Sequence, residues 1–153
     1  MKLPANLIIE ADGGSRGNPG LAGSGACVID ADSGQVILEV SKFIGIATNN
    51  VAEYIALVAG LEGAYGLNPD ARILVRMDSK LVIEQMAGRW KIKHPDMQQL
   101  GARVQSLVSG KRVRWQWIPR EENSRADALA NKAMDEQGDA VVAKQTDSPR
   151  SPV

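Results

Sequence analysis

The chain has 153 residues, of which 44% are hydrophobic, and its 18 lysines and arginines balance its 18 aspartates and glutamates. This length suits one domain with a core that needs no disulfides, and the zero net charge means that any nucleic-acid partner must be held by a local basic patch. With one histidine, His94, and one cysteine, Cys27, the composition argues against a serine triad, a cysteine protease dyad and a histidine-rich metal site. Any catalysis by this chain must therefore depend on carboxylates.

The composition also favours a cytoplasmic protein that does not enter a membrane. Cys27 lies within an apolar run, as expected for a small buried side chain in a reducing compartment. The N-terminus shows no basic-then-apolar leader, and no apolar run approaches the roughly 18 residues that cross a bilayer. We expect a monomer with a folded domain over residues 1–137. Residues 138–153 lose hydrophobic periodicity, which predicts a disordered tail or linker.

The first part of the chain predicts an antiparallel meander. Residues 7–12 form an apolar, β-branched run that ends in Asp12, and the glycines that follow predict a sharp turn directly after this strand. Residues 24–30 and 35–46 predict the next two strands, which would pair with the first in order.

The second part alternates helices with strands, which predicts parallel pairing. Residues 51–65 carry a helical stripe of apolar positions, and residues 73–77 alternate as a strand that leads to Asp78. Further helices at residues 80–87, 96–107 and 124–137 and a fifth strand, at an edge, over residues 113–118 complete the pattern. The expected fold is α/β, with a five-stranded mixed sheet of a three-strand antiparallel meander plus parallel strands, flanked by helices.

Four acidic residues occupy equivalent places in this pattern. Asp12 and Asp78 follow strands, whereas Glu53 and Asp127 lie in the first turns of helices, and in open α/β sheets this edge is where ligands bind. Two carboxylates about 4 Å apart repel by roughly 4 kcal/mol at an effective dielectric near 20, so a fold that gathers four of them needs cations. Oxygen ligands favour Mg²⁺ or Mn²⁺, and two such ions support in-line displacement at a phosphodiester.

Two other interpretations stand beside this one. Each acid has a structural explanation, because Asn50-x-x-Glu53 and Ser124-x-x-Asp127 both resemble helix capping boxes. The glycines between residues 13 and 25 also suggest a nucleotide-binding loop. A dinucleotide fingerprint must open a helix, however, and residues 21–30 have the pattern of a strand.

Four motifs occur in order between residues 7 and 134. They are Asp12-Gly13-Gly14 with Asn18-Pro19-Gly20, Thr48-Asn49-Asn50-x-x-Glu53, Met77-Asp78-Ser79, and Asn123-x-x-Ala126-Asp127-x-Leu129-Ala130. Together they resemble type 1 ribonuclease H. The resemblance implies a ribonuclease H-like fold and an endonuclease that hydrolyses the RNA strand of RNA/DNA hybrids by a two-metal-ion mechanism, leaving 5′-phosphate and 3′-hydroxyl ends. Asp12, Glu53, Asp78 and Asp127 would hold two Mg²⁺ ions, with Mn²⁺ as a substitute. A module that binds hybrids without cutting them is the alternative, and the complete acidic set argues against it.

The resemblance also implies residues that contact the hybrid. They are Asn18, Thr48, Asn49, Asn50, Trp90 and Asn123. An enzyme that cuts RNA only when it is paired with DNA must sense 2′-hydroxyls along a minor groove, and amide side chains suit that purpose. The competing explanations are turn and cap chemistry for the asparagines and a place in the core for Trp90.

The sequence departs from the family in two places. Residues 90–95 are too few for the basic helical protrusion of long members, although residues 89–94 supply a local basic patch. Many members also place a histidine in the loop before the last helix, where it is thought to assist proton transfer or product departure. The loop at residues 119–123 has no histidine, and Arg120 is the candidate catalytic residue in its place.

Overall fold

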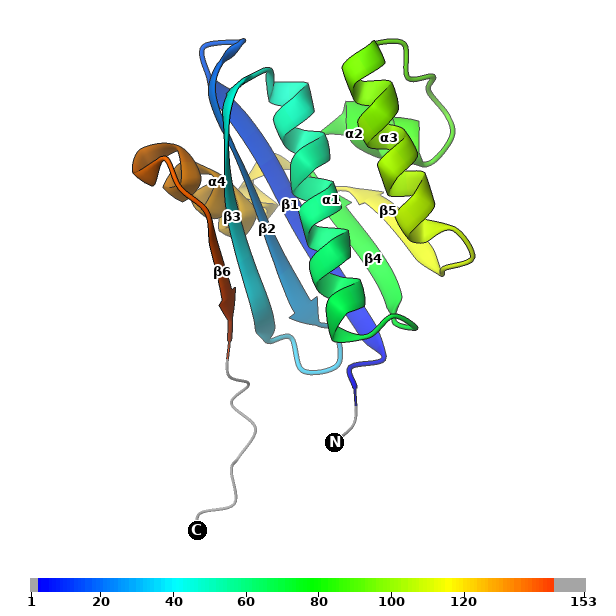
Figure 1. Cartoon of the computed structure of the whole chain (residues 1–153). Coiled ribbons are helices and arrows are strands. Elements are labelled where there is room, and N and C mark those ends of the chain that lie inside the picture. The colour runs from blue at the N-terminus through cyan, green and yellow to red at the C-terminus, as the bar shows by residue number, and fades with distance from the viewer. Residues whose placement is uncertain (1–2, 145–153) are drawn as a thin grey trace.

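The computed structural model describes residues 3–144, which form one mixed sheet with helices on both of its faces (Figure 1). The strands are β1 (Asn6–Arg16), β2 (Gly20–Asp30), β3 (Val36–Ala47), β4 (Arg72–Met77), β5 (Val113–Trp117) and β6 (Ala140–Ala143). The helices are α1 (Asn49–Leu67), α2 (Lys80–Met86), α3 (Pro95–Val108), the short 3₁₀ helix η1 (Arg120–Glu122) and α4 (Ser124–Glu136). The order across the sheet is β5-β4-β1-β2-β3-β6.

The pairing of the first five strands follows the sequence pattern. β1 to β3 form an antiparallel meander, β4 pairs parallel with β1, and β5 pairs parallel with β4 at one edge. Both the meander and the parallel strands are confirmed.

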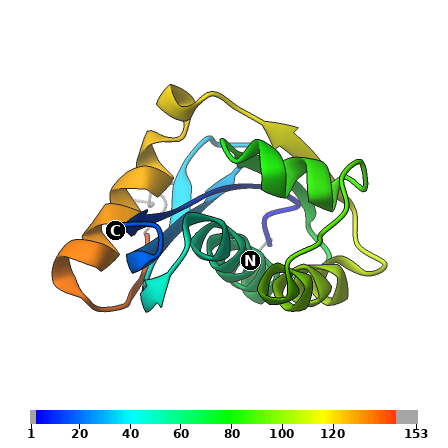
Figure 2. The ribbon, with the colours of Figure 1, turned by 90° about the horizontal axis from the view of Figure 1, so that it is seen from above.

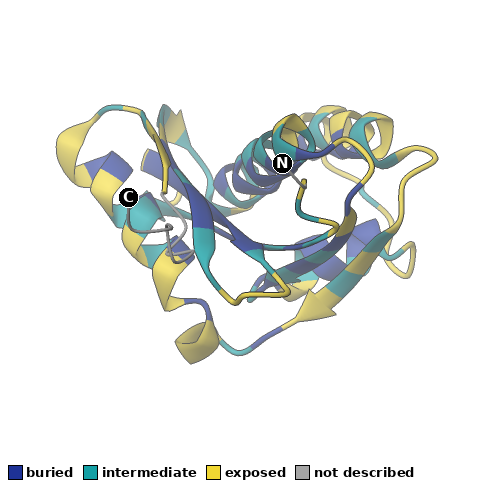
Figure 3. Cartoon of the chain, turned by 90° about the horizontal axis from the view of Figure 1, so that it is seen from below, coloured by how far each residue is buried: buried dark blue, intermediate teal, exposed yellow. Residues whose placement is uncertain are grey.

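Different helices cover the two faces of the sheet. Figure 2 shows α1 and α3 together on one face and α4 on the opposite face, over the meander. Alternate residues of β1, such as Leu7 and Ile9, are buried beneath α1, where Gly60 lets the helix approach Ile9 closely. Buried residues run through the middle of the sheet, whereas much of β5 is exposed (Figure 3). No helix within residues 3–144 combines the length and the apolar character that crossing a membrane would require.

The sheet has six strands, so the expectation of five was wrong. Ala140–Ala143 forms β6, which lies inside the segment predicted to be a tail and pairs antiparallel with β3. Side-chain contacts support this edge, because Asp139 accepts a hydrogen bond from the backbone N–H of Phe43 at 2.7 Å and Lys144 pairs with Glu39 at 3.1 Å. A four-residue strand is too short to show a period of two, which is why the sequence did not reveal it. Residues 145–153 of the predicted tail lie outside the described residues.

The sharp turn expected directly after Asp12 was also wrong. β1 continues to Arg16, which pairs with Leu21 of β2, and the turn lies at residues 17–19, where Gly17 has a φ of +94°. Asp12 instead lies just beyond the end of the parallel pairing with β4, which covers residues 6–10 of β1. The carboxylate therefore still stands at the edge where the parallel strands end.

Glycines in β1 and β2 allow two helices to touch the sheet backbone. A Cβ atom on Gly13 would lie 2.2 Å from the carbonyl carbon of Ala52 in α1, and one on Gly25 would lie 2.3 Å from the carbonyl oxygen of Ala126 in α4. Contacts this short do not occur, so any larger residue at either position must push the helix away.

Replacement of Gly25 by alanine tests this packing. We expect Gly25→Ala to lower the free energy of unfolding by about 2–3 kcal/mol, because α4 must shift to admit the methyl group. Gly66→Ala is the matched control, since a Cβ there meets no atom within 4 Å, and it should stabilise α1 by about 0.5–1 kcal/mol. Urea unfolding measures both, and equal stabilities of the two variants would contradict the account.

Candidate active site

Four carboxylates from four elements line one cavity of about 510 Å³. They are Asp12 of β1, Glu53 of α1, Asp78 directly after β4 and Asp127 of α4. Arg120 of η1 lines the same cavity. The structure thus brings the four acids singled out in the sequence to one place, which we call the active-site cavity.

The capping-box explanation does not account for Glu53 or Asp127. Thr48 is the N-cap of α1, and its Oγ1 accepts a hydrogen bond from the backbone N–H of Val51 at 3.2 Å. The N-cap of α4 is Asn123, which makes no side-chain cap hydrogen bond. Both acids are therefore free to face the cavity.

Asn123 holds Asp78 in position from inside the protein. Its side chain is only 1% exposed, and its Nδ2 donates to the backbone oxygen of Ala11 and to Oδ1 of Asp78, both at 2.9 Å. This geometry links β1 to the end of β4 and orients the Asp78 carboxylate. It differs from the substrate contact predicted for Asn123, because a buried side chain with these partners does not reach a ligand in the cavity.

Burial and mutual repulsion change the acidity of two of the carboxylates. Burial first, and then the charges of Asp78, Asp127 and Glu53, raise the pKa of Asp12 from 3.8 to about 8, together with a hydrogen bond to Asp127. Burial and the charge of Asp78 raise the pKa of Glu53 from 4.5 to about 7. The site therefore favours anything that supplies positive charge between these groups.

The donor set fits a hard divalent cation. The four groups supply oxygen only, which suits Mg²⁺ or Mn²⁺ and not a softer metal. Within residues 3–144, no three histidine, cysteine or acidic side chains close into a compact ligand set by themselves. Mg²⁺ usually takes one or two carboxylates from a protein and completes its shell with waters and substrate phosphates, so acids spread around an open cavity match its coordination.

A buried acid, Glu10, lies behind the active-site cavity and was not identified from the sequence as functional. It is 1% exposed and accepts hydrogen bonds from Arg76 Nη1 at 3.1 Å and from Arg125 Nε at 3.1 Å. Each of the three residues stands two positions before a cavity carboxylate, on β1, β4 and α4. One carboxylate thus ties together the three elements that carry Asp12, Asp78 and Asp127. A charged residue inside the apolar run of residues 7–11 was the available signal.

The other predicted contact residues lie around two neighbouring cavities. Asn49 and Asn50 line the active-site cavity, and a second cavity of about 220 Å³ is lined by Asn18, Thr48, Asn50, Val51, His94 and Met97. His94, to which the sequence gave no role, caps α3 by accepting from the backbone N–H of Asp96 at 3.2 Å.

The basic segment after α2 is exposed. Trp90 is 46% exposed, so the competing explanation, that it packs in the core, is not supported. Arg89 forms two hydrogen bonds with Glu84, which lowers the pKa of that acid. Lys91 and Lys93 are also exposed, and they are the cations of this segment that form no ion pair within residues 3–144.

The glycine-rich stretch does not form a nucleotide-binding loop. The chain passes from β1 through residues 17–19 into β2, so the glycines join two antiparallel strands and open no helix. The nucleotide-binding interpretation is therefore wrong.

Comparison with known proteins places the chain in a family. Residues 10–133 match the family model described as "Reverse transcriptase-like". Ribonuclease H of Alcanivorax borkumensis is 34% identical over 86% of this chain and 93% of its own length. The chain belongs to the type 1 ribonuclease H family.

Two solved ribonuclease H structures share the fold closely. The N-terminal RNase H domain of Rv2228c from Mycobacterium tuberculosis has a TM-score of 0.83 and 54% identity, over 86% of this chain and 95% of that one. LC11-RNase H1, solved in complex with an RNA/DNA hybrid, has a TM-score of 0.82 and 40% identity, over 86% and 99%. The complete Rv2228c, named a bifunctional protein, is 51% identical over 95% of this chain, which spans only 42% of its length.

The candidate active site of this chain has an arginine in the loop before α4. Residues 119–123 contain η1, which turns Arg120 toward the cavity that the four acids line. Glu122 of the same loop accepts a hydrogen bond from Arg76 Nη2 at 3.2 Å. It thereby joins the loop to Glu10, Arg76 and Arg125, which we call the Glu10 cluster. The loop is therefore anchored while Arg120 remains exposed.

The Glu10 cluster should support both the fold and the site. We expect Glu10→Gln to lower the free energy of unfolding by about 2–3 kcal/mol, because a neutral amide leaves two guanidinium groups without their buried partner. Glu62→Gln removes an exposed pair with Arg103 and should change stability by less than about 0.5 kcal/mol. Denaturant unfolding compares the two, and equal losses would show that the Glu10 cluster does not hold these elements together.

The raised pKa values predict how stability depends on pH without divalent metal. The pKa of Asp12 is about 8 in the folded state against 3.8, and that of Glu53 is about 7 against 4.5, so the folded state holds more protons. Their contribution is fully present below pH about 4 and is lost as the pH rises to about 8. Thermal unfolding in a chelator should therefore show falling stability from pH 5 to pH 8. Added Mg²⁺ should reverse that fall, and a metal-free stability that rises over this range would contradict the electrostatic account.

Proposed function

We propose that this chain hydrolyses the RNA strand of RNA/DNA hybrids, with divalent metal ions held by its four cavity carboxylates. The observation that carries the proposal is the convergence of Asp12, Glu53, Asp78 and Asp127 on one open cavity whose charges need a cation. The similarity to ribonuclease H proteins, one of them solved with an RNA/DNA hybrid, supports the choice of substrate. Because the chain spans less than half of Rv2228c, the proposal concerns this ribonuclease H domain.

The proposed reaction is an in-line displacement at phosphorus. The four cavity carboxylates would hold two Mg²⁺ ions, or Mn²⁺ in their place, whose chemistry would be to make water more acidic and to supply positive charge to a departing oxygen. The oxygen of water would form a new bond to phosphorus as the bond from phosphorus to the 3′ oxygen breaks. The departing 3′ oxygen takes up a proton to become a 3′-hydroxyl, and the other product keeps a 5′-phosphate. Asn123 keeps Asp78 oriented toward the cavity throughout, and the guanidinium of Arg120 is available to bind the new terminal phosphate.

The asparagines near the turn between β1 and β2 provide donors for the hybrid. Oδ1 of Asn18 accepts from the backbone N–H of Asn49 at 3.1 Å, and Oδ1 of Asn49 accepts from the backbone N–H of Ser15 at 2.7 Å. The amide NH₂ of each forms no hydrogen bond with the described part of the chain. Turn chemistry and substrate binding are therefore compatible, because one end of each amide fixes the loop and the other can contact 2′-hydroxyls or base edges.

The cavity beside Thr48 suits a phosphate of the DNA strand. Thr48 uses its hydroxyl oxygen to cap α1, so the hydroxyl proton remains to donate to an anion. Asn18, Asn50 and His94 line the same cavity, next to the four acids. A contact here would let the enzyme require a DNA strand as well as an RNA strand.

The exposed segment after α2 would extend this contact. Trp90 has a face available to pack against a deoxyribose, and Lys91 and Lys93 supply the local positive charge that the neutral composition lacks. Without a longer protrusion, hybrid binding should be sensitive to salt. The monomeric state and the cytoplasmic location remain predictions from the sequence.

Loss of a cavity carboxylate separates the enzyme from a module that binds hybrids without cutting them. We expect Asp78→Asn to abolish Mg²⁺-dependent cleavage of a labelled RNA/DNA hybrid and to stabilise the metal-free protein slightly, since it removes like charge but keeps the oxygen that Asn123 binds. Asp70→Asn, in the exposed loop before β4, should leave cleavage unchanged. Cleavage by Asp78→Asn within about tenfold of the parent would refute the proposed metal site, and no cleavage by the parent would favour the non-cleaving module.

Arg120 should contribute less to turnover than the four acids, because we expect it to act only on the negative charge of the new terminal phosphate, which develops late in the reaction. We expect Arg120→Ala to lower turnover on saturating hybrid by about ten- to a hundredfold, on the order of 1.4–2.7 kcal/mol. Arg120→Lys should recover part of the loss, since the charge survives while the planar fork does not. Steady-state rates decide the matter, and an alanine variant that turns over like the parent would leave this loop without a catalytic role.

A further inference from the structure

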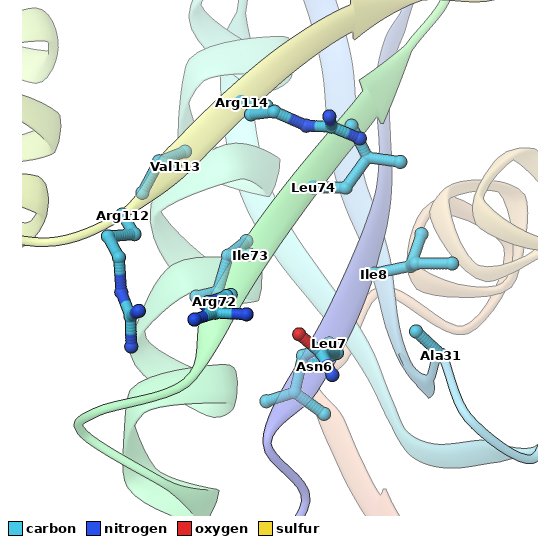
Figure 4. A pocket seen from close by; sticks show the side chains of 10 residues that line it. All are labelled: Asn6, Leu7, Ile8, Ala31, Arg72, Ile73, Leu74, Arg112, Val113 and Arg114. Carbon is cyan, nitrogen blue, oxygen red and sulfur yellow. The ribbon is translucent and has the colours of Figure 1, made fainter.

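A second hollow of similar size lies on the face of the sheet that α1 does not cover. Its volume is about 490 Å³, and it lies where β1, β4 and β5 begin, at the end of these strands away from the active-site cavity (Figure 4). Asn6, Ile8, Ala31, Leu74 and three arginines are among the residues that line it. The arginines are Arg72, Arg112 and Arg114, and we call this hollow the arginine pocket.

Two neighbouring aliphatic side chains give the arginine pocket an apolar floor. Ile8 of β1 and Leu74 of β4 are paired across the strands, and Arg114 of β5 is paired with Leu74 on the other side. Figure 4 shows the side chain of Arg114 extending toward Leu74. Both aliphatic residues are only partly buried, so their surface is accessible to a partner.

The three arginines carry positive charge that this chain does not neutralise. All three are exposed, and none forms an ion pair or a side-chain hydrogen bond with any other residue in the range 3–144. Arg76, which lies on β4 beyond Arg72, differs because it pairs with Glu10 and Glu122. Asp30 and Asp32 flank Ala31 in the sequence, yet neither carboxylate forms an ion pair with these arginines, and Oδ1 of Asp30 accepts from the backbone N–H of Asp32.

The arrangement carries an electrostatic cost until an anion is present. Arg72 begins β4 and Arg112 directly precedes the adjacent strand β5, where the backbone N–H of Ile73 donates to the backbone oxygen of Arg112 at 3.0 Å. Like charges on neighbouring strands are destabilising. With an overall net charge of zero, three unpaired cations around one apolar floor are a local excess.

We propose that the arginine pocket binds an acidic peptide segment of a partner protein, with an apolar side chain of that segment on Ile8 and Leu74. Carboxylates of the segment would pair with Arg72, Arg112 and Arg114, whose planar guanidinium groups bind carboxylates through two hydrogen bonds. The apolar anchor supplies affinity, and the charges around it supply specificity and a fast encounter.

The lining favours a peptide over a nucleic acid. Single strands are usually held by aromatic side chains on which the bases stack, and the residues that line this pocket include no phenylalanine, tyrosine or tryptophan. The backbone of a duplex offers phosphates to the arginines but no apolar group for the floor that Ile8 and Leu74 form.

The proposed partner would not compete with a substrate at the four acids. Arg72 begins β4 and Asp78 follows its end, so at about 3.3 Å per residue the two lie about 20 Å apart along the strand. A partner bound in the arginine pocket would therefore bring the chain to a site of action while the active-site cavity stays open. This inference does not depend on the proposed function.

Fluorescence anisotropy with a labelled peptide tests the proposal. The probe is a short peptide of alternating Glu-Asp pairs and leucines, and we expect the triple variant Arg72→Ala, Arg112→Ala, Arg114→Ala to bind it at least roughly tenfold more weakly than the parent. The matched control removes three exposed positive charges elsewhere, with Lys42→Ala, Arg103→Ala and Lys132→Ala, and should bind within about twofold of the parent. Cleavage of hybrid should be the same in both triple variants.

Two further probes identify what the pocket accepts. A peptide with serines in place of the leucines should bind the parent roughly tenfold more weakly, and Leu74→Ala should reduce this difference. Equal binding of the probe by the two triple variants, or equal binding of the leucine and serine peptides, would overturn the proposal. A single-stranded oligonucleotide of matched charge that binds more tightly than the peptide, through the same arginines, would also overturn it.

Discussion

The candidate site depends on direct contact between helix backbone and sheet backbone. Gly13 and Gly25 leave no room for a side chain beneath α1 and α4, and this lack of bulk brings Glu53 and Asp127 over the strand that carries Asp12. Asp78 reaches the same place because β4 runs parallel to β1 and ends beside it. Each acid thus arrives through the geometry of a different element, and a shift of either helix would separate the set.

The four carboxylates repel one another when they are ionised. Two features of the chain allow them to stay close together. Burial and neighbouring charge raise the pKa of Asp12 to about 8, so part of the charge is lost when no cation is near. Behind the cavity, Arg76 and Arg125 approach from β4 and α4 and meet on Glu10. A buried acid with two guanidinium partners is a poor source of stability by itself, but it fixes the relative positions of two strands, β1 and β4, and one helix, α4. Rigidity of this kind is what a metal site needs from the residues around its ligands.

Much of this could be predicted from the sequence, and the failures have physical reasons. The four acids were identifiable because each lies at the end of a strand pattern or in the first turn of a helical pattern. The sixth strand was not, since Ala140–Ala143 is short and depends on pairing with β3. The continuation of β1 past Asp12 was hidden because Gly13 and Gly14 normally indicate a turn, whereas here they serve close packing in a strand. Glu10 stood out as a charge inside an apolar run, but its partners and the buried role of Asn123 depend on contacts between residues about 45 to 115 positions apart, which no local pattern shows.

The two ends of the central strands would then have different functions, catalysis at the active-site cavity and partner binding at the arginine pocket. The central claim is that the active-site cavity binds divalent metal. Paramagnetic broadening by Mn²⁺ of the backbone amide signals in an NMR spectrum of the intact chain measures this directly. The account predicts that the amides of Gly13, Glu53 and Asp127 broaden first, at substoichiometric Mn²⁺, while those of Arg72 and Arg112 stay sharp. Broadening that centres on another group of acids, or that spreads evenly over the exposed carboxylates, would contradict it.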